Sequence, residues 1–252
     1  MTLFPDKDVA YSSVEKYPEL WFDHVAYCVA DPRDAFGVLR RDLGVEWRLW
    51  EMNGDFGGVQ VEFPSAFKVE LIHPNSTNRD HFTNRFLERR GPGPHHLTFR
   101  TKDLRALLQR ADGLDIGVIQ MSLDNPEWME AFIHPRTTGG ILVQIAQCPF
   151  EKASAEEPDW KTQTPRRRAG FARVDFGSDD PAASRRVFGD LLGGEVEHGP
   201  DGSVEFRWNG DRRIRVVTTP TPYVTLMVDC PMETTEREEF VRLLGGRVET
   251  EG

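Results

Sequence analysis

The sequence predicts an α+β fold built from repeated βαβββ units, and three observations lead to this class. Short apolar or alternating runs of β-forming residues follow one another, with one capped helical segment after the first run of each group. The group at residues 22–74 is matched in order by a second group at 94–147. Asp and Pro open a helix at residues 31–32 and again at 180–181, with Gly following both helices.

The elements follow in a regular order along the chain. Residues 1–20 are expected to form an irregular arm. The first unit has a strand, a helix and three strands, at residues 22–30, 31–44, 45–52, 57–63 and 67–74. A helical or loop segment at 81–91 precedes the second unit, whose elements lie at residues 94–101, 102–113, 117–124, 127–135 and 139–147. We expect residues 21–149 to form one domain of two paired units.

The remainder of the chain repeats the pattern incompletely. Residues 150–168 are rich in charge, Pro and Ser/Thr, which is the composition of a linker. Residues 169–252 contain a third unit, made of a strand, a helix and three strands, and then a fourth unit that stops after its helix. We expect one and a half degenerate units here. Arg173 stands where the first unit has His24, and Val216 stands near the place of Glu70, so no second metal site is expected.

The composition indicates a folded protein and excludes several partners. The 252 residues, 38% hydrophobic with 16 Phe and 6 Trp, suffice for real cores. The formal charge of -10 would repel nucleic acid. No stretch approaches the roughly 20 apolar residues of a membrane span, and the N-terminus has no signal pattern, so we expect a cytoplasmic protein. The three separated cysteines are expected to be small buried hydrophobes.

Each of the first two units sends ligand-type residues out of an otherwise apolar strand. Alternate strand residues share a face, so Glu70 points away from the apolar neighbours that flank it, and Gln144 does the same. His24 to Glu70 spans 46 residues and His96 to Gln144 spans 48. When two such units pair their sheets, these four positions can converge and offer two imidazoles, a carboxylate and an amide oxygen to one divalent metal ion.

The chain resembles the vicinal oxygen chelate superfamily, which includes the glyoxalases, bleomycin resistance proteins and dioxygenases, and it is most similar to the methylmalonyl-CoA epimerases. The resemblance covers residues 22–149 and is carried by DHVAYCVAD, KVELIHP, PHHLTFRTKDL and HPRTTGGILVQIAQCP. It implies a cup-shaped mixed sheet with helices outside. It also implies that His24, Glu70, His96 and Gln144 bind the metal, and it selects His96 over His95, which is left on the core face.

The resemblance implies a reaction as well as a metal. Its metal, Co, Mn, Ni, Zn or Fe, would stabilise an enolate or enediolate while a carboxylate moves a proton. The usual bases align with Gln144 and near Gln60, and an amide accepts no proton usefully at neutral pH. Glu62, two residues from Gln60 on the same strand face, is the substitute that we expect.

Three functions remain open at this point. The first is a metal-dependent isomerase or lyase acting on a small substrate with adjacent oxygens, such as an acyl-CoA. The second is an Fe(II)-dependent dioxygenase, because two histidines and one carboxylate also suit non-haem iron. The third is a non-catalytic protein that binds a small molecule. Either a monomer or a homodimer is compatible with the sequence.

Overall fold

The computed structural model describes residues 9–13, 18–154, 160, 164–208 and 212–251. In this part of the chain it has an eight-stranded sheet, a six-stranded sheet and a two-stranded ribbon. No helix in the described residues is long and apolar enough to cross a membrane.

The eight-stranded sheet confirms the two predicted βαβββ units. Its strands are β2 (Leu20–Cys28), β3 (Glu46–Asn53), β4 (Phe56–Glu62), β5 (Lys68–Pro74), β6 (Gly93–Thr101), β7 (Val118–Ser122), β8 (Met129–Ile133) and β9 (Leu142–Gln147). Their order is β3-β4-β5-β2-β6-β9-β8-β7. Within each unit the first strand runs parallel to the last, and the two units join through the antiparallel pair of β2 and β6.

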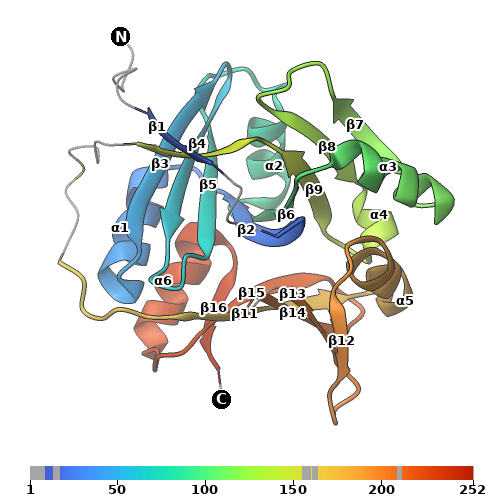
Figure 1. Cartoon of the computed structure of the whole chain (residues 1–252). Coiled ribbons are helices and arrows are strands. Elements are labelled where there is room, and N and C mark those ends of the chain that lie inside the picture. Colours follow the sequence, from blue (N-terminus) through green and yellow to red (C-terminus); the bar gives the residue numbers. More distant parts are fainter. Residues whose placement is uncertain (1–8, 14–17, 155–159, 161–163, 209–211, 252) are drawn as a thin grey trace.

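The strands form the predicted cup. In Figure 1, β3, β4 and β5 stand on one side and β7, β8 and β9 on the other, with β2 and β6 between them. The four central strands, β5, β2, β6 and β9, are called the floor of the cup, and the outer pairs, β3 with β4 and β8 with β7, are called its walls. Four helices accompany the sheet: α1 (Pro32–Leu43), α2 (Phe82–Arg90), α3 (Leu104–Gly113) and α4 (Pro135–Thr138). The predicted caps of α1 are confirmed, since the Asp31 side chain accepts from the backbone N–H of Arg33 and Gly44 has a φ of 68°.

The six-stranded sheet is the predicted degenerate part. It comprises β11 (Phe171–Ser178), β12 (Glu195–His198), β13 (Val204–Trp208), β14 (Arg212–Thr218), β15 (Tyr223–Val228) and β16 (Arg247–Thr250), in the order β12-β13-β14-β11-β15-β16. Its helices are α5 (Pro181–Arg185), which continues as a π-helical segment (Arg186–Leu191), and α6 (Thr234–Leu244). The fourth unit was predicted to stop after its helix. Instead β16 follows α6 and runs parallel to β15, in the place that β9 takes beside β6.

The register of the two sheets identifies equivalent positions. Ala26 pairs with Glu70 and His96 in the first sheet, and Asp175 pairs with Arg215 and Thr225 in the second. With Arg173 in the place of His24, Asp175 corresponds to Ala26, and Arg215 therefore takes the place of Glu70. Val216, which was predicted to lie near this place, is the next residue and points to the opposite face.

The Arg173 guanidinium contacts Asp175 at 2.6 Å and also Glu251. Strand β11 therefore carries the guanidinium of Arg173 at the position where β2 carries the imidazole of His24.

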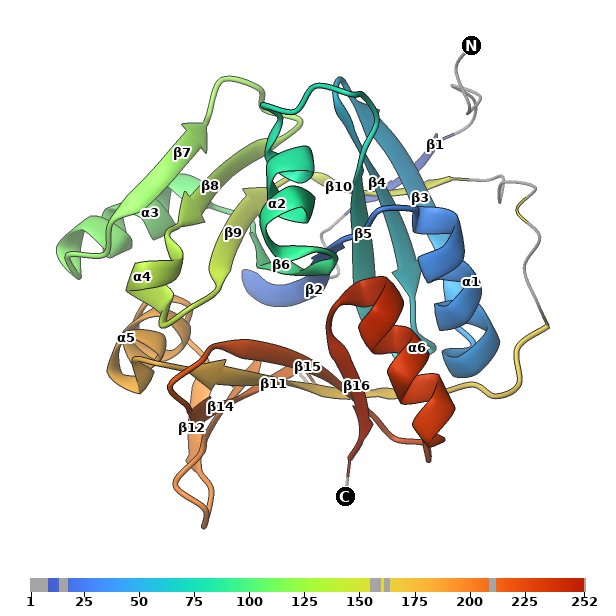
Figure 2. The same cartoon turned by 180° about the vertical axis from the view of Figure 1, so that it is seen from behind.

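Aromatic side chains join the two large sheets. The Phe67 and Phe171 rings stack with centroids 3.6 Å apart, and the Trp208 ring lies 4.9 Å from Phe99 and 6.1 Å from Phe22. In Figure 2 the six-stranded sheet lies beneath β2, and α6 stands beside α1. The apolar face of the cup floor is therefore buried, and its polar face is left for the site.

The two-stranded ribbon gives regular structure to part of the predicted arm and of the predicted linker. Its strand β1 (Val9–Ser13) pairs antiparallel with β10 (Phe150–Ser154). Trp160, further along the predicted linker, packs its ring 5.5 Å from Trp47 and 5.6 Å from Trp50. The connecting segment is thereby fixed against the wall of the cup at this point. The division into an arm (1–20), a domain of two units (21–149), a linker (150–168) and a degenerate partial domain (169–252) stays a prediction.

Candidate metal centre

Three of the predicted ligands meet on the floor of the cup. His24 lies on β2, Glu70 on β5 and His96 on β6, and their ligating atoms all lie within 4.8 Å of one another. Oε2 of Glu70 is 3.3 Å from Nε2 of His24 and 3.8 Å from Nε2 of His96. Among the residues that the structure describes, this is the one group of three or more His, Cys, Asp or Glu side chains with such spacing.

The burial of these groups fits a metal ion. His24 and His96 are 2% and 5% exposed, and neither Nε2 atom has a hydrogen-bond partner. Buried polar atoms are nearly always satisfied in folded proteins, so two unsatisfied imidazole nitrogens beside one carboxylate need an explanation. Two imidazoles and a carboxylate are a common donor set for divalent zinc and iron, and the residues fit such an ion.

The electrostatics of the group are strongly coupled. Burial alone would lower the pKa of His24, but Glu70 and Asp23 together raise it to about 9. Burial and the neighbouring imidazoles of His95 and His24 lower the pKa of His96 well below its usual value. Burial would raise the pKa of Glu70, yet His24 and Gln60 hold it below its usual value. The His24 imidazole therefore favours the protonated form, and the His96 imidazole favours the neutral form.

A second layer of side chains supports His24, and the sequence pattern did not predict it. The register of β2 against β6 shifts between Phe22 and His24. The Asp23 carboxylate contacts Nδ1 of His24 at 2.7 Å and Nζ of Lys68 at 2.7 Å, and it accepts a 3.0 Å hydrogen bond from the Trp21 indole. An alternating strand pattern would have placed Asp23 on the face opposite to His24.

His95 lies outside the cluster. Its ring packs against Phe82 and Phe86 of α2, with centroids 5.4 and 5.1 Å away. Its Nδ1 is nevertheless 2.8 Å from Nδ1 of His96, so one of the two nitrogens donates to the other. His95 therefore borders the site through its neighbour.

Gln144 lies beside this cluster with both ends of its amide engaged. Its Oε1 accepts a 2.8 Å hydrogen bond from the Thr98 hydroxyl, and its Nε2 donates to Glu130 at 2.7 Å. Glu130, on β8, also accepts a 3.0 Å hydrogen bond from the Trp128 indole. The sequence pattern did not indicate this carboxylate, because the pairing of β8 with β9 cannot be assigned from alternation alone.

Gln60 and Glu62 lie on the wall next to Glu70. Nε2 of Gln60 donates to Oε1 of Glu70 at 3.4 Å, and Gln60 faces Glu70 directly in the sheet register. Glu62 faces Lys68 in the same register and accepts a 3.2 Å hydrogen bond from Arg48. Gln60 therefore contacts the cluster, whereas Glu62 is engaged in an ion pair one step further along the strand.

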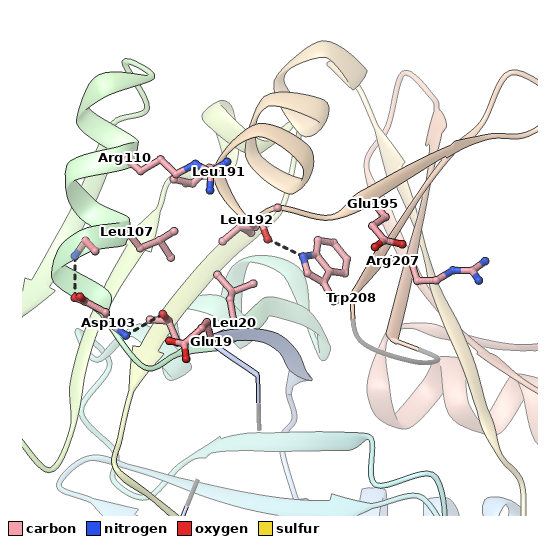
Figure 3. Close-up of a pocket in the computed structure, with 13 residues that line it drawn as sticks. Glu19, Leu20, Asp103, Leu107, Arg110, Leu191, Leu192, Glu195, Arg207 and Trp208 are labelled. Atoms are coloured by element: carbon pink, nitrogen blue, oxygen red, sulfur yellow. Dashed lines mark hydrogen bonds between the residues drawn. The ribbon is translucent and has the colours of Figure 1, made fainter. Parts of the chain in front are cut away.

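A cleft lies away from the metal centre. It has a volume of about 540 Å³ and runs between α3 on one side and, on the other, Leu191 and Leu192 at the end of the π-helical segment and Trp208 of β13 (Figure 3). None of the predicted site residues lines it.

Comparison with known proteins agrees with the fold. Residues 23–128 match the model of the Glyoxalase/Bleomycin resistance protein/Dioxygenase superfamily. The uncharacterized protein YqjC of Bacillus subtilis is 30% identical over 129 residues, which are 50% of this chain and 90% of that protein. The methylmalonyl-CoA epimerase of Mycobacterium tuberculosis is 26% identical with a TM-score of 0.46, covering 50% of this chain and 87% of its own.

A comparison at the level of the fold reaches further along the chain. A variant of 4-hydroxymandelate synthase from Streptomyces coelicolor is 15% identical with a TM-score of 0.60, and the match covers 88% of this chain and 74% of that one. The similarity thus extends from the cup into the six-stranded sheet. The chain belongs to the glyoxalase/bleomycin resistance protein/dioxygenase superfamily.

Proposed function

We propose that this protein is a metal-dependent isomerase or lyase that stabilises an enolate or enediolate of a small substrate with two adjacent oxygens. The observation that carries the proposal is the pair of buried Nε2 atoms of His24 and His96, which have no hydrogen-bond partner and lie beside the Glu70 carboxylate. A divalent ion, Co, Mn, Ni, Zn or Fe, held there would supply Lewis acidity for the developing negative charge.

We propose Gln144 as the fourth ligand, through its amide oxygen. The Thr98 hydroxyl and the Glu130 carboxylate together fix which end of the amide is which, because the hydroxyl donates to the oxygen and the carboxylate accepts from the nitrogen. A carbonyl oxygen has a second lone pair, so the contact with Thr98 leaves one for a metal ion.

The proton must be moved by a group other than the two amides. Gln60 donates to Glu70, which supports a role in holding that carboxylate in position. Glu62 remains the base that we propose on this wall, and it would have to leave Arg48 to act. Glu130 is a second carboxylate on the opposite wall, in contact with Gln144. Groups on the two walls could reach opposite faces of one carbon atom.

An acyl-CoA thioester or an α-hydroxy carbonyl compound is the substrate class that this chemistry suits. An α-hydroxy carbonyl compound offers two oxygens on neighbouring carbons and an acidic C–H bond on the hydroxyl-bearing carbon. An acyl-CoA thioester has an acidic C–H bond next to its carbonyl group, and it offers a second oxygen when its 2-position carries an oxygen-bearing group. A cytoplasmic location and the state of assembly stay predictions of the sequence.

The second candidate is an Fe(II)-dependent dioxygenase of the same superfamily. Two histidines and one carboxylate form a donor set that suits non-haem iron, and His24, Glu70 and His96 supply it. The third is a protein that binds a small molecule without a reaction, for which the amides at the usual base positions are the supporting observation.

The test is exchange of substrate protons with deuterated water. The protein would be loaded separately with Co, Mn, Ni, Zn and Fe and incubated with 2-substituted acyl thioesters and α-hydroxy ketones. We expect deuterium at the acidic carbon with at least one metal and none in the metal-free protein. Oxygen consumption that occurs with iron alone would favour the dioxygenase, and absence of both would favour the binding protein.

A further inference from the structure

A buried ion pair stands directly behind one of the proposed ligands. The side chains of Asp23 and Lys68 are 3% and 4% exposed, and they contact each other at 2.7 Å. The same carboxylate contacts Nδ1 of His24 at 2.7 Å, while the Nε2 atom of that ring is aimed at Glu70. Asp23 therefore contacts one nitrogen of the imidazole, and the Glu70 carboxylate lies near the other.

The pairing of β2 with its neighbouring strands places Asp23 and Lys68 close to the His24 ring. Lys68 faces His24 in the parallel register of β2 and β5, and the register shift of β2 brings Asp23 onto the same side. The Trp21 indole donates a 3.0 Å hydrogen bond to Oδ1 of Asp23, which is the same oxygen that contacts Lys68. The orientation of the carboxylate is thus fixed by three neighbours, and both of its oxygens are used.

Stability alone is a weak reason for such an arrangement. Burial of two charges costs desolvation energy that their attraction often fails to repay, and apolar residues of similar volume are frequently as stable. A hydrogen bond from the remote nitrogen of a histidine, in contrast, selects the tautomer whose other nitrogen is free to bind a metal. Lys68 neutralises Asp23, so the acceptor adds no net charge next to Glu70.

We infer that Asp23, held by Lys68 and Trp21, is a positioning residue that fixes His24 with its proton on Nδ1 and its Nε2 lone pair directed to the metal. The inference rests on the proposed metal site. Loss of an outer partner of a metal-bound histidine typically weakens metal binding about 10- to 100-fold. The role of Lys68 is to hold the carboxylate and to balance its charge.

The experiment measures the affinity of Co(II) and Zn(II) by competition with a chelator, together with thermal unfolding of each metal-free variant. The variants are Asp23→Ala, Asp23→Asn and the double variant Asp23→Ala with Lys68→Met. Asp42→Ala is the matched control, because Asp42 is 0% exposed and pairs with Arg41 on α1. All affinities are measured at a temperature at which every variant is folded.

We expect Asp23→Ala to weaken Co(II) binding about 10- to 100-fold and to alter the visible absorption of the bound ion. Asp23→Asn should recover part of the affinity, because its carbonyl still accepts from Nδ1. The double variant should recover thermal stability, since the buried lysine that has lost Asp23 is replaced by an apolar side chain, but it should not recover affinity. Asp42→Ala should lower stability and leave affinity within twofold.

Affinity that returns together with stability in the double variant would overturn the positioning role and leave Asp23 as a structural residue. Asp23→Ala with unchanged affinity would do the same, although the metal site itself would stand. Failure of the wild-type protein to bind either metal would overturn the proposed function together with this inference.

Discussion

Glu236 anchors the start of α6 to the segment that joins the two large sheets, and its replacement by Gln should measure that anchor. Glu236 is 4% exposed. Its oxygens accept hydrogen bonds of 2.7 and 3.0 Å from Arg167 and one of 3.0 Å from the backbone N–H of Glu233. Breaking a buried ion pair costs about 3–5 kcal/mol, and the partial exposure of Arg167 reduces this to about 2 kcal/mol.

The effect should depend on pH with a defined sign. Burial would raise the pKa of Glu236, but the Glu233 backbone and Arg167 hold it below the ordinary value of 4.5. A carboxylate with a depressed pKa in the folded state contributes stability above the unfolded pKa and loses it as pH falls through the folded pKa. The difference between wild type and Glu236→Gln should therefore be complete at neutral pH and shrink in acid.

Thermal unfolding followed by circular dichroism at pH 7 and at about pH 3.5 measures both claims. A loss of about 2 kcal/mol corresponds to a melting temperature about 4 to 8 °C lower for a chain of this size at pH 7. Glu238→Gln, exposed on the same helix, is the control and should melt with the wild type. Equal stability of Glu236→Gln and wild type at pH 7, or a difference that grows in acid, would refute the reasoning.

Two further substitutions test the packing and the site. Phe67→Ala removes a side chain that is 0% exposed and stacked on the second sheet, and it should cost about 3–5 kcal/mol of unfolding free energy in urea titrations; a loss below 1 kcal/mol would mean that the sheets do not pack as described. Gly58→Ala would place a methyl group 3.1 Å from Oε1 of Glu70 and should weaken metal binding several-fold, whereas Gly37→Ala, with open space around it, should not; equal affinities would show that the carboxylate moves freely.

Most of the fold could be predicted from local features of the sequence. The Asp and Pro pairs at 31–32 and 180–181 cap helices as predicted, and the alternation of apolar residues located the strands of both cup units. These features depend on neighbours within a few residues, which is why a sequence reveals them. The same repeat placed His24, Glu70 and His96 in one cluster.

The features that the sequence missed depend on pairing between distant segments. The ribbon of β1 and β10 and the strand β16 are short, and each is defined by its partner. Asp23 reaches His24 because the register shifts by one position, and strict alternation cannot express such a shift. The position of Glu130 next to Gln144 depends on the pairing of β8 with β9, which the sequence alone does not reveal.

The measurement that tests the central claim most directly is the metal content of protein purified without added metal or chelator. Wild type would be compared with His96→Ala and with His198→Ala, whose side chain is exposed on β12 of the second sheet. We predict about one equivalent of a divalent metal in wild type and in His198→Ala, and a loss of that metal in His96→Ala. Absence of metal from all three proteins after reconstitution, or equal metal in His96→Ala, would contradict the account.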